Sequence, residues 1–232
     1  MTQPIVAKLE NRWLNSTPLT GIKWFSELLL KERAGKITQK QKDFLTQIYN
    51  SNHRMIRLVS DLLDVSHIDT GAKFETHKTK SDIQEMINQA IQDSVALIEE
   101  KDIIIKDRVK TVKRMEFEFD KQKIRQVFYN LISNAIKYSK QGGIVEISCD
   151  CDWKNKKMIN FHVKDEGIGI PKSQQNKVFS KFFRADNAII TQADGTGLGL
   201  YITKAIIEAH GGKLWFESEE NKGTTFHFSL KN

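Results

Sequence analysis

Apolar residues in the first seventy positions recur every three or four residues, which is the spacing of one face of a helix. One such stripe runs through residues 9–29 and a second through residues 44–68, with the short turn AGKIT between them. Thr38 and Gln41 stand in the T-x-x-Q arrangement of a capping box at the start of the second stripe. This periodicity predicts a helical hairpin over residues 1–70.

Two amphipathic helices joined by a short turn cannot bury both of their apolar stripes by themselves. A second hairpin would complete a four-helix bundle, and the simplest source of that hairpin is a second copy of the chain. We therefore expect a homodimer through residues 1–70. Gly71 ends the second helix, and the polar stretch at residues 71–80 is typical of a linker.

Residues 81–232 alternate between helical and extended patterns, which predicts a second domain. Ser81 and Gln84 repeat the capping arrangement before a helix expected to reach about Glu99, and Asp120 precedes a helix through RQVFYNLISNAIKYS. A further helix, YITKAIIEAHGG, is closed by glycine. The expected strands are IIIKDRV, MEFEF, GIVEISCDC, KMINFHVKD, KLWFES and TTFHFSL. This mixture predicts an α+β fold with helices stacked on one face of a mixed sheet.

Composition argues against two classes of function. The net charge of +7 arises from 36 basic and 29 acidic residues interspersed along most of the chain, which favours a solvated surface over a nucleic-acid interface. No apolar run approaches the roughly 18 residues of a membrane span, and the N-terminus lacks a signal-peptide pattern. Cys149 and Cys151 are too few to form a zinc site. Two cysteines in a chain of this length are typical of a protein from a reducing cytoplasm.

Four short motifs in the second domain carry the residues suited to binding chemistry. NLISNAIKY places Asn130, Asn134, Lys137 and Tyr138 on adjacent turns of one helix. DEGIGIP, residues 165–171, joins a strand end to a tight turn in which glycines let the backbone approach a ligand.

The third and fourth motifs follow further along the chain. GTGLGLYI, residues 195–202, feeds a helix N-terminus, where free amides and the helix dipole favour phosphate. GTTF, residues 223–226, begins the last strand. Each motif alone is weak, because a glycine-rich stretch is more often a plain turn and helical asparagines are often surface residues. All four in this order indicate a nucleotide site.

The combination closely resembles the catalytic and ATP-binding domain of sensor histidine kinases, in the superfamily with gyrase, the large heat-shock chaperone and mismatch-repair ATPases. VFSKFFRAD matches that family's phenylalanine box at Phe179, Phe182, Phe183 and Arg184. The hairpin also resembles the family's dimerisation and histidine-phosphotransfer domain, and RMIRLVSDLLDVSHIDTG is similar to its usual ending. The resemblance covers residues 13–230 and implies a dimeric four-helix bundle followed by an α/β sandwich.

The resemblance implies a role for each matching position. Asp165 would accept a hydrogen bond from the adenine amino group, with Thr225 and a water nearby, and Asn134 would ligate Mg2+. Lys181 and Arg184 would stabilise charge on the transferring phosphoryl group. The implied nucleotide-binding residues are Asn130, Asn134, Lys137, Tyr138, Asp165, Gly167, Gly169, Ile170, Gly195, Thr196, Gly197, Leu198, Gly199, Leu200 and Thr225.

Two further features bear on the reaction. The segment RADNAIITQADG, residues 184–195, would be a mobile lid. Asn130 stands where the ATPase relatives carry a glutamate that activates water, and an amide has no basic site for that task. Phosphoryl transfer from ATP to a protein side chain therefore fits better than hydrolysis, with a response regulator as the implied partner.

The opening segment departs from the family pattern. Its first helix normally carries H-E-L-R-T-P-L, and TPL is present here at residues 17–19, so Pro18 is the family's kink. Counting back places Trp13 at the phosphoacceptor position and Leu14 at its acidic neighbour. An indole nitrogen has no available lone pair, so Trp13 cannot accept phosphate as imidazole does. A degenerate kinase, an engineered chain and a replaced N-terminus are all compatible with this departure.

Other histidines could substitute as acceptors. His53 and His67 lie on the second helix, where a lone histidine is more often a surface or packing residue. The leading hypothesis is a dimeric histidine-kinase core whose own acceptor is missing or altered. The alternative is a non-catalytic ATP-binding scaffold that signals through nucleotide-dependent conformation.

Overall fold

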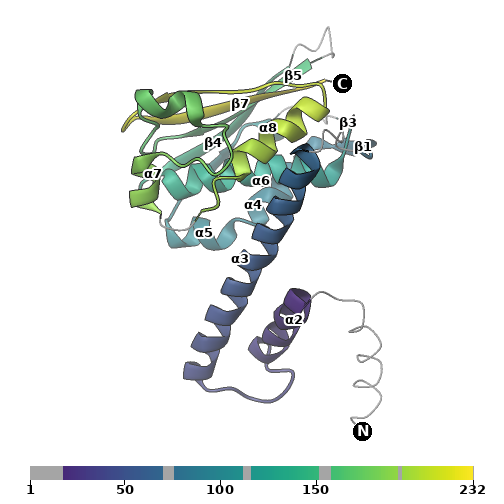
Figure 1. The fold of residues 1–232 in the computed structure, drawn as a ribbon, viewed down its shortest axis with the longest axis vertical. Coiled ribbons are helices and arrows are strands. Elements are labelled where there is room, and N and C mark those ends of the chain that lie inside the picture. The colour runs from purple at the N-terminus through teal and green to yellow at the C-terminus, as the bar shows by residue number, and fades with distance from the viewer. Residues whose placement is uncertain (1–17, 70–75, 112–115, 152–157, 193–194, 232) are drawn as a thin grey trace. The chain divides into compact units, whose positions relative to one another are not determined.

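The computed structural model describes residues 18–69, 76–111, 116–151, 158–192 and 195–231. They fall into two compact units whose boundary in sequence lies between Asp64 and Val65, inside a helix. The first unit is a helical hairpin and the second combines helices with sheets (Figure 1). Within the described ranges, no helix has both the length and the apolar character that a membrane span requires.

The hairpin consists of α2 (Pro18–Leu30) and α3 (Gln39–Asp69). The predicted capping box at the start of α3 is confirmed. The Thr38 backbone N–H donates to Gln41 Oε1 at 2.8 Å, and the Gln41 N–H donates to Thr38 Oγ1 at 3.3 Å. Pro18 is the first described residue, so Trp13 and Leu14 lie outside the described residues.

The hairpin contains a buried polar contact and leaves much apolar surface exposed. Asn52, which is 1% exposed, donates through Nδ2 to the Leu19 carbonyl at 2.7 Å and so ties α3 to α2. Side chains from both helices remain more than 40% exposed: Ile22, Phe25, Phe44, Ile48, Met55, Leu58, Val59, Leu62 and Leu63. An apolar surface of this extent is typical of an interaction face.

The second unit contains two sheets. In the smaller, β1 (Thr79–Asp82) pairs antiparallel with β3 (Glu116–Phe119). The larger has five strands in the order β2-β4-β5-β7-β6, of which only β2 and β4 are parallel. Its strands are β2 (Ile104–Asp107), β4 (Ile144–Cys151), β5 (Met158–Asp165), β6 (Leu214–Glu219) and β7 (Gly223–Lys231).

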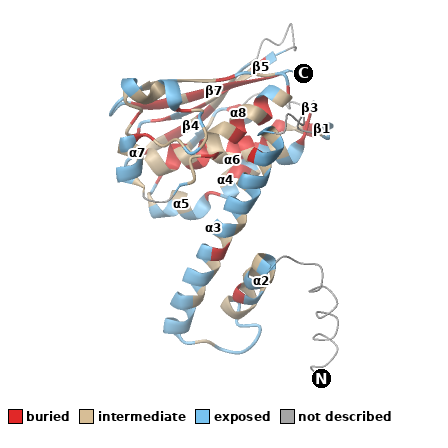
Figure 2. Ribbon diagram, viewed as in Figure 1, coloured by how far each residue is buried: buried red, intermediate tan, exposed pale blue. Residues whose placement is uncertain are grey.

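Helices cover one face of the five-stranded sheet, as Figure 1 shows for α4, α6 and α8. This arrangement confirms the predicted fold class. The helices of the unit are α4 (Ile83–Gln92), α5 (Val95–Glu100), α6 (Lys121–Tyr138), α7 (Asp186–Thr191) and α8 (Gly199–Ala209), with short 3-10 helices at Val109–Thr111 and Lys172–Lys177. Figure 2 shows buried residues concentrated where α6, α8 and the sheet face one another.

Three phenylalanines form the centre of the core. Phe128 on α6 lies 5.6 Å from Phe161 on β5 and 5.2 Å from Phe228 on β7, measured between ring centroids, and all three are fully buried. Edge-to-face pairs of this kind add about 0.5–1.5 kcal/mol beyond the area they bury. The cluster therefore fixes α6, which carries the first motif, against β5, which ends at the second motif, and β7, which begins with the fourth.

The helix caps agree with the sequence at one position and differ at another. Asp120 caps α6 as predicted, since its Oδ1 accepts the N–H groups of Gln122 and Lys123 at 3.0 and 3.1 Å. Ser81 is not the cap of α4, because the helix begins at Ile83 and the residue directly before it is Asp82. The cap is Asp82, which accepts the Gln84 N–H at 3.0 Å.

Two predicted boundaries also differ from the structure. The helix expected to reach Glu99 is interrupted, and α5 begins at Val95 after α4 has ended at Gln92. Residues 71–80 are expected to be a linker, but the last two of them, Thr79 and Lys80, are the first two residues of β1. Residues 70–75 lie outside the described residues.

The two aspartate caps support a matched stability test. Asp120 also accepts the His77 N–H through Oδ2 at 3.1 Å and is only 8% exposed, so it satisfies backbone donors on two segments. We expect Asp120→Ala to lower the free energy of unfolding by about 2–3 kcal/mol and Asp82→Ala by about 1 kcal/mol. Urea unfolding of the full chain, followed by circular dichroism, measures both. Equal losses would contradict the assigned role of Asp120.

Candidate functional site

A buried carboxylate, Asp165, ends β5 and is only 5% exposed. Its Oδ1 accepts the backbone N–H groups of Gly167 at 2.9 Å and Thr224 at 3.2 Å. Among the described residues no group donates to Oδ2, so this oxygen is available to an external donor. Burial raises the pKa of Asp165 to about 6, although the two N–H groups oppose the shift.

Glycines allow three backbone segments to meet at Asp165. A Cβ on Gly167 would lie 2.2 Å from the Tyr138 carbonyl oxygen, and one on Gly223 would lie 2.1 Å from the Asp165 carbonyl oxygen. The Ile168 N–H donates to the same Tyr138 carbonyl at 3.1 Å. Since neither glycine has room for a side chain, the end of α6, the DEGIGIP turn and the start of β7 lie in direct backbone contact.

The far side of the DEGIGIP turn is held by residues that the motifs did not reveal. Gly169 has φ +61°, and a Cβ there would lie 2.0 Å from the Glu219 carbonyl oxygen. The Ile170 N–H donates to Ser218 Oγ at 2.9 Å, and Asn187 Nδ2 donates to the Gly169 carbonyl at 3.0 Å. Ser218 and Asn187 stand outside every recognisable pattern, so only the fold identifies them.

The first and third motifs meet between α6 and α8. Asn130 Nδ2 donates to the Gly199 carbonyl at 3.3 Å and to Thr203 Oγ1 at 3.2 Å. Asn134 lies one turn further along α6 and is half-buried, as are Lys137 and Tyr138. The structure therefore uses the Asn130 amide to join the two helices.

The glycine-rich turn leads directly into the N-terminus of α8. Gly197 has φ +68°, a conformation that favours glycine, and the Leu198 N–H donates to Thr196 Oγ1 at 3.2 Å. No side chain caps the N-terminus of α8. Since the first amides of a helix have no intrahelical acceptor, this end of α8 is suited to an anion such as phosphate.

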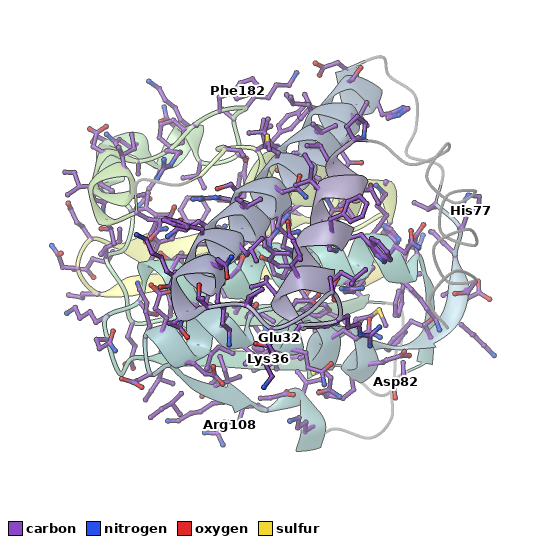
Figure 3. All side chains as sticks on the ribbon, turned by 90° about the horizontal axis from the view of Figure 1, so that it is seen from below. Glu32, Lys36, His77, Asp82, Arg108 and Phe182 are labelled. Carbon is purple, nitrogen blue, oxygen red and sulfur yellow. The ribbon has the colours of Figure 1, made fainter. Side chains whose placement is uncertain are left out.

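The phenylalanine box packs beside this turn. Phe179 lies 5.6 Å from Phe216 between ring centroids, and Phe183 packs against the core. Phe182 is 63% exposed and has φ +58°, which is unusual for a bulky residue (Figure 3). Its backbone lies against Gly197, where a Cβ would come within 2.6 Å of the Phe182 carbonyl carbon. The box and the turn are thus in direct contact.

The two predicted catalytic cations are held by acceptors of the protein. Arg184 Nη2 donates to the Ala188 carbonyl at 3.2 Å and to the Gln192 carbonyl, which are at the middle and the end of the predicted lid. That segment contains α7, and a Cβ on Gly195 would lie 3.2 Å from Arg184 Cζ. Lys181 Nζ donates to Asp69, the last residue of α3.

The structure brings Thr224 rather than Thr225 to Asp165. Successive residues of a strand point to opposite faces, and Thr224 is 6% exposed on the helix-covered face. Thr225 pairs with Lys164 and shares the opposite face with His227. The side chain expected near the adenine, Thr225, is therefore on the other side of the sheet from the Asp165 carboxylate.

A divalent cation could take few ligands from this site. The described residues contain no cluster of three histidine, cysteine, aspartate or glutamate side chains arranged to hold a metal ion. The Asn134 amide oxygen is the kind of hard donor that Mg2+ accepts, and this ion commonly retains water and binds phosphate oxygens. The donor set thus fits a cation that arrives with a phosphate group rather than a metal held by protein alone.

Comparisons with known proteins agree with these observations. The family model described as histidine kinase-, DNA gyrase B-, and HSP90-like ATPase matches residues 119–232, and the His Kinase A (phospho-acceptor) domain matches residues 16–71. The chain is 39% identical over 92% of its length to the sensor histidine kinase WalK of Bacillus subtilis, strain 168. It spans about a third of that relative, 34% of its length.

Solved structures show the same relationship. The catalytic domain of histidine kinase ThkA, in a nucleotide-free form, is 30% identical with a TM-score of 0.55, over 67% of this chain and 95% of that domain. Full-length ShkA in complex with AMPPNP is 26% identical with a TM-score of 0.70, over 99% of this chain and 46% of that one.

Substitution of Asp165 by asparagine should stabilise the protein when no nucleotide is bound. An increase of the carboxyl pKa from its ordinary 3.8 to about 6 means that the ionised form destabilises the fold by ~3 kcal/mol at pH 7. Asparagine keeps an oxygen for the two N–H donors and carries no charge. We expect Asp165→Asn to gain up to about 3 kcal/mol at pH 7, and the gain to shrink as pH falls from 6 to below 3.8.

Thermal unfolding at several pH values measures this difference. Glu220→Gln is the matched control, because Glu220 is an exposed carboxylate of the same unit. A stability gain that does not depend on pH, or a loss at pH 7, would contradict the assigned burial of an ionised Asp165.

Proposed function

Because this chain belongs to the sensor histidine kinase family, we propose that it binds Mg-ATP and supports phosphoryl transfer to a histidine in two-component signalling. The observation that carries this proposal is the buried Asp165 carboxylate beside glycine-lined backbone, whose Oδ2 accepts no hydrogen bond from the described residues. An amino group on a purine ring is a hydrogen-bond donor that such a carboxylate oxygen can accept from.

Adenine recognition follows from the partners of Asp165. The two backbone N–H groups hold Oδ1 in place, so Oδ2 keeps a fixed direction and can accept from the adenine amino group. Gly167, Gly169 and Ile170 form the turn beside it. A nucleoside without that amino group would leave Oδ2 of the buried carboxylate without a donor, which is the usual basis of strong discrimination.

The phosphates would lie at the start of α8. Amides of Gly197, Leu198 and Gly199 would donate to phosphate oxygens, with Gly195, Thr196 and Leu200 completing the turn. Lys137 and Tyr138 would contact phosphates or ribose from α6. Mg2+ would be held by Asn134 and would neutralise phosphate charge.

The residues favour transfer over hydrolysis. Asn130 supplies an amide where a water-activating base would be required, and its Nδ2 is already engaged by α8. Lys181 and Arg184 would stabilise the charge on the transferring group once they are released from their present acceptors. The attacking nucleophile must then be a side chain, and the family relationship makes it a histidine.

Assembly and partner follow from the hairpin. The nine exposed apolar side chains of α2 and α3 support a homodimer, in which a second hairpin would complete a four-helix bundle. Light scattering of the full chain measures this directly, and a monomer at micromolar concentration would refute it. We further propose a response regulator as the partner that receives the phosphoryl group, and a cytoplasmic location.

A second candidate function rests on one observation. The family's acceptor position carries Trp13, which cannot be phosphorylated as a histidine can. Since Trp13 and Leu14 lie outside the described residues, this assignment depends on the register of the TPL motif at residues 17–19. The second candidate is an ATP-binding scaffold that undergoes nucleotide-dependent change without transferring phosphate.

One incubation with radiolabelled Mg-ATP separates the two candidates. We expect negligible acid-labile, base-stable phosphate on the unmodified chain, and transfer to an added hairpin that carries an acceptor histidine. The double substitution Trp13→His with Leu14→Glu should restore labelling in the chain itself.

Two results would change the assignment. Strong histidine labelling of the unmodified chain would refute the role of Trp13 and direct attention to His53 and His67. Failure to label either the double variant or the added hairpin, while ATP still binds, would favour the scaffold.

A further inference from the structure

The larger unit begins within α3, because the last turn of that helix packs into its core. Val65 is 7% exposed and belongs to the core cluster, and Ile68 packs against the same cluster. Asp69 ends this turn and is half exposed. The final turn of α3 and the candidate nucleotide site are therefore parts of one unit.

Asp69 contacts two residues through a single oxygen. Lys181 Nζ donates to Asp69 Oδ1, and Tyr201 Oη donates to the same oxygen at 3.4 Å. Lys181 Nζ also lies 5.1 Å from the centroid of the Tyr201 ring, within range of a cation–π interaction. The pKa of Lys181 is raised, chiefly by its hydrogen bond to Asp69, so Lys181 carries its positive charge at neutral pH.

Both partners of Asp69 are next to the glycine-rich turn. Lys181 immediately precedes Phe182, whose backbone is in contact with Gly197. Tyr201 lies on the first turn of α8, two residues after Gly199. A carboxylate at the end of α3 is thus bound to residues on either side of the segment suited to phosphate.

The two anions would compete for the same cation. Lys181 ends in a compact ammonium on a flexible stem and is 33% exposed, so it can turn from one acceptor to another. The terminal phosphate of a nucleotide carries several anionic oxygens, and each can accept a hydrogen bond from Lys181 in place of the Asp69 carboxylate. Contact of Lys181 with the last phosphate of a nucleotide would therefore remove the ion pair that Asp69 makes now.

We propose that Asp69 is a latch that competes with the terminal phosphate of bound ATP for Lys181, so that ATP weakens the attachment of the last turn of α3. This inference rests on the proposed function, in which Lys181 reaches the transferring phosphoryl group. The latch consists of Asp69, Lys181 and Tyr201. It couples the occupancy of the nucleotide site to the helix that leads back to the hairpin.

The coupling is reciprocal and modest in size. If ATP weakens the latch, removal of the latch must strengthen ATP binding by the same factor. Exposed ion pairs contribute little, so we expect a factor of about two to five. ADP lacks the terminal phosphate, so its affinity should change by much less.

Calorimetry on the full chain with ATP and with ADP tests the proposal. Asp69→Asn should raise the affinity for ATP about two- to fivefold and leave that for ADP nearly unchanged. In a Lys181→Met background the same substitution should have no effect. Asp93→Asn is the matched control, because Asp93 forms another exposed ion pair of this unit, 2.6 Å from Arg125 Nη2, away from the site residues.

Hydrogen exchange provides a second readout that does not depend on affinity. Amides of residues 65–69 should exchange faster with ATP than with ADP in the unmodified chain, and equally fast with both in Asp69→Asn. An affinity gain common to ATP and ADP, or none in Asp69→Asn, would overturn the latch while leaving ATP binding intact. Absence of ATP binding in the unmodified chain would instead overturn the proposed function, and the latch with it.

Discussion

The buried carboxylate of Asp165 is the interaction on which the site depends. An ionised carboxylate that is 5% exposed is unfavourable unless polar groups face it, and two backbone N–H groups do so here. The Gly167 N–H comes from the turn that follows β5, and the Thr224 N–H comes from β7. The carboxylate can therefore be accommodated only when β5, β7 and the turn are assembled together.

That assembly requires backbone contacts that only glycine permits. Gly167 and Gly223 each lie where a Cβ would overlap a carbonyl oxygen, so a side chain at either position would push Asp165 out of place. The phenylalanine cluster of Phe128, Phe161 and Phe228 holds α6 against the same strands. Packing in the core thus sets the position of Asn130 and Asn134 relative to the carboxylate.

Local signals in the sequence predicted much of this structure. The capping box at Thr38 and the cap at Asp120 depend on neighbouring residues, and both are present. Ser81 is not the cap of α4, because β1 extends through Asp82 and the helix starts one residue later than the local pattern implies. The resemblance points to Thr225, but a motif does not show which face of the sheet a side chain lies on, and it is the Thr224 N–H that donates to Asp165.

The contacts of Lys181 could not be predicted from local patterns. Its partner Asp69 is 112 positions away, and neither residue belongs to a pattern that implies the pair. Ser218 and Asn187 support the DEGIGIP turn from segments 48 and 18 positions away from the residues they contact. Sequence motifs identified the groups that suit a nucleotide, whereas the fold identified the groups that hold those motifs in position.

The most direct test of the account is the affinity of the full chain for ATP and for inosine triphosphate, whose base carries an oxygen in place of the amino group. We predict that ATP binds about tenfold more tightly or better at pH 7.5, because inosine offers Asp165 no amino hydrogen there. The difference should narrow at pH 5, below the raised pKa of about 6. Equal affinities at pH 7.5 would contradict the assignment of Asp165 as the adenine-binding residue.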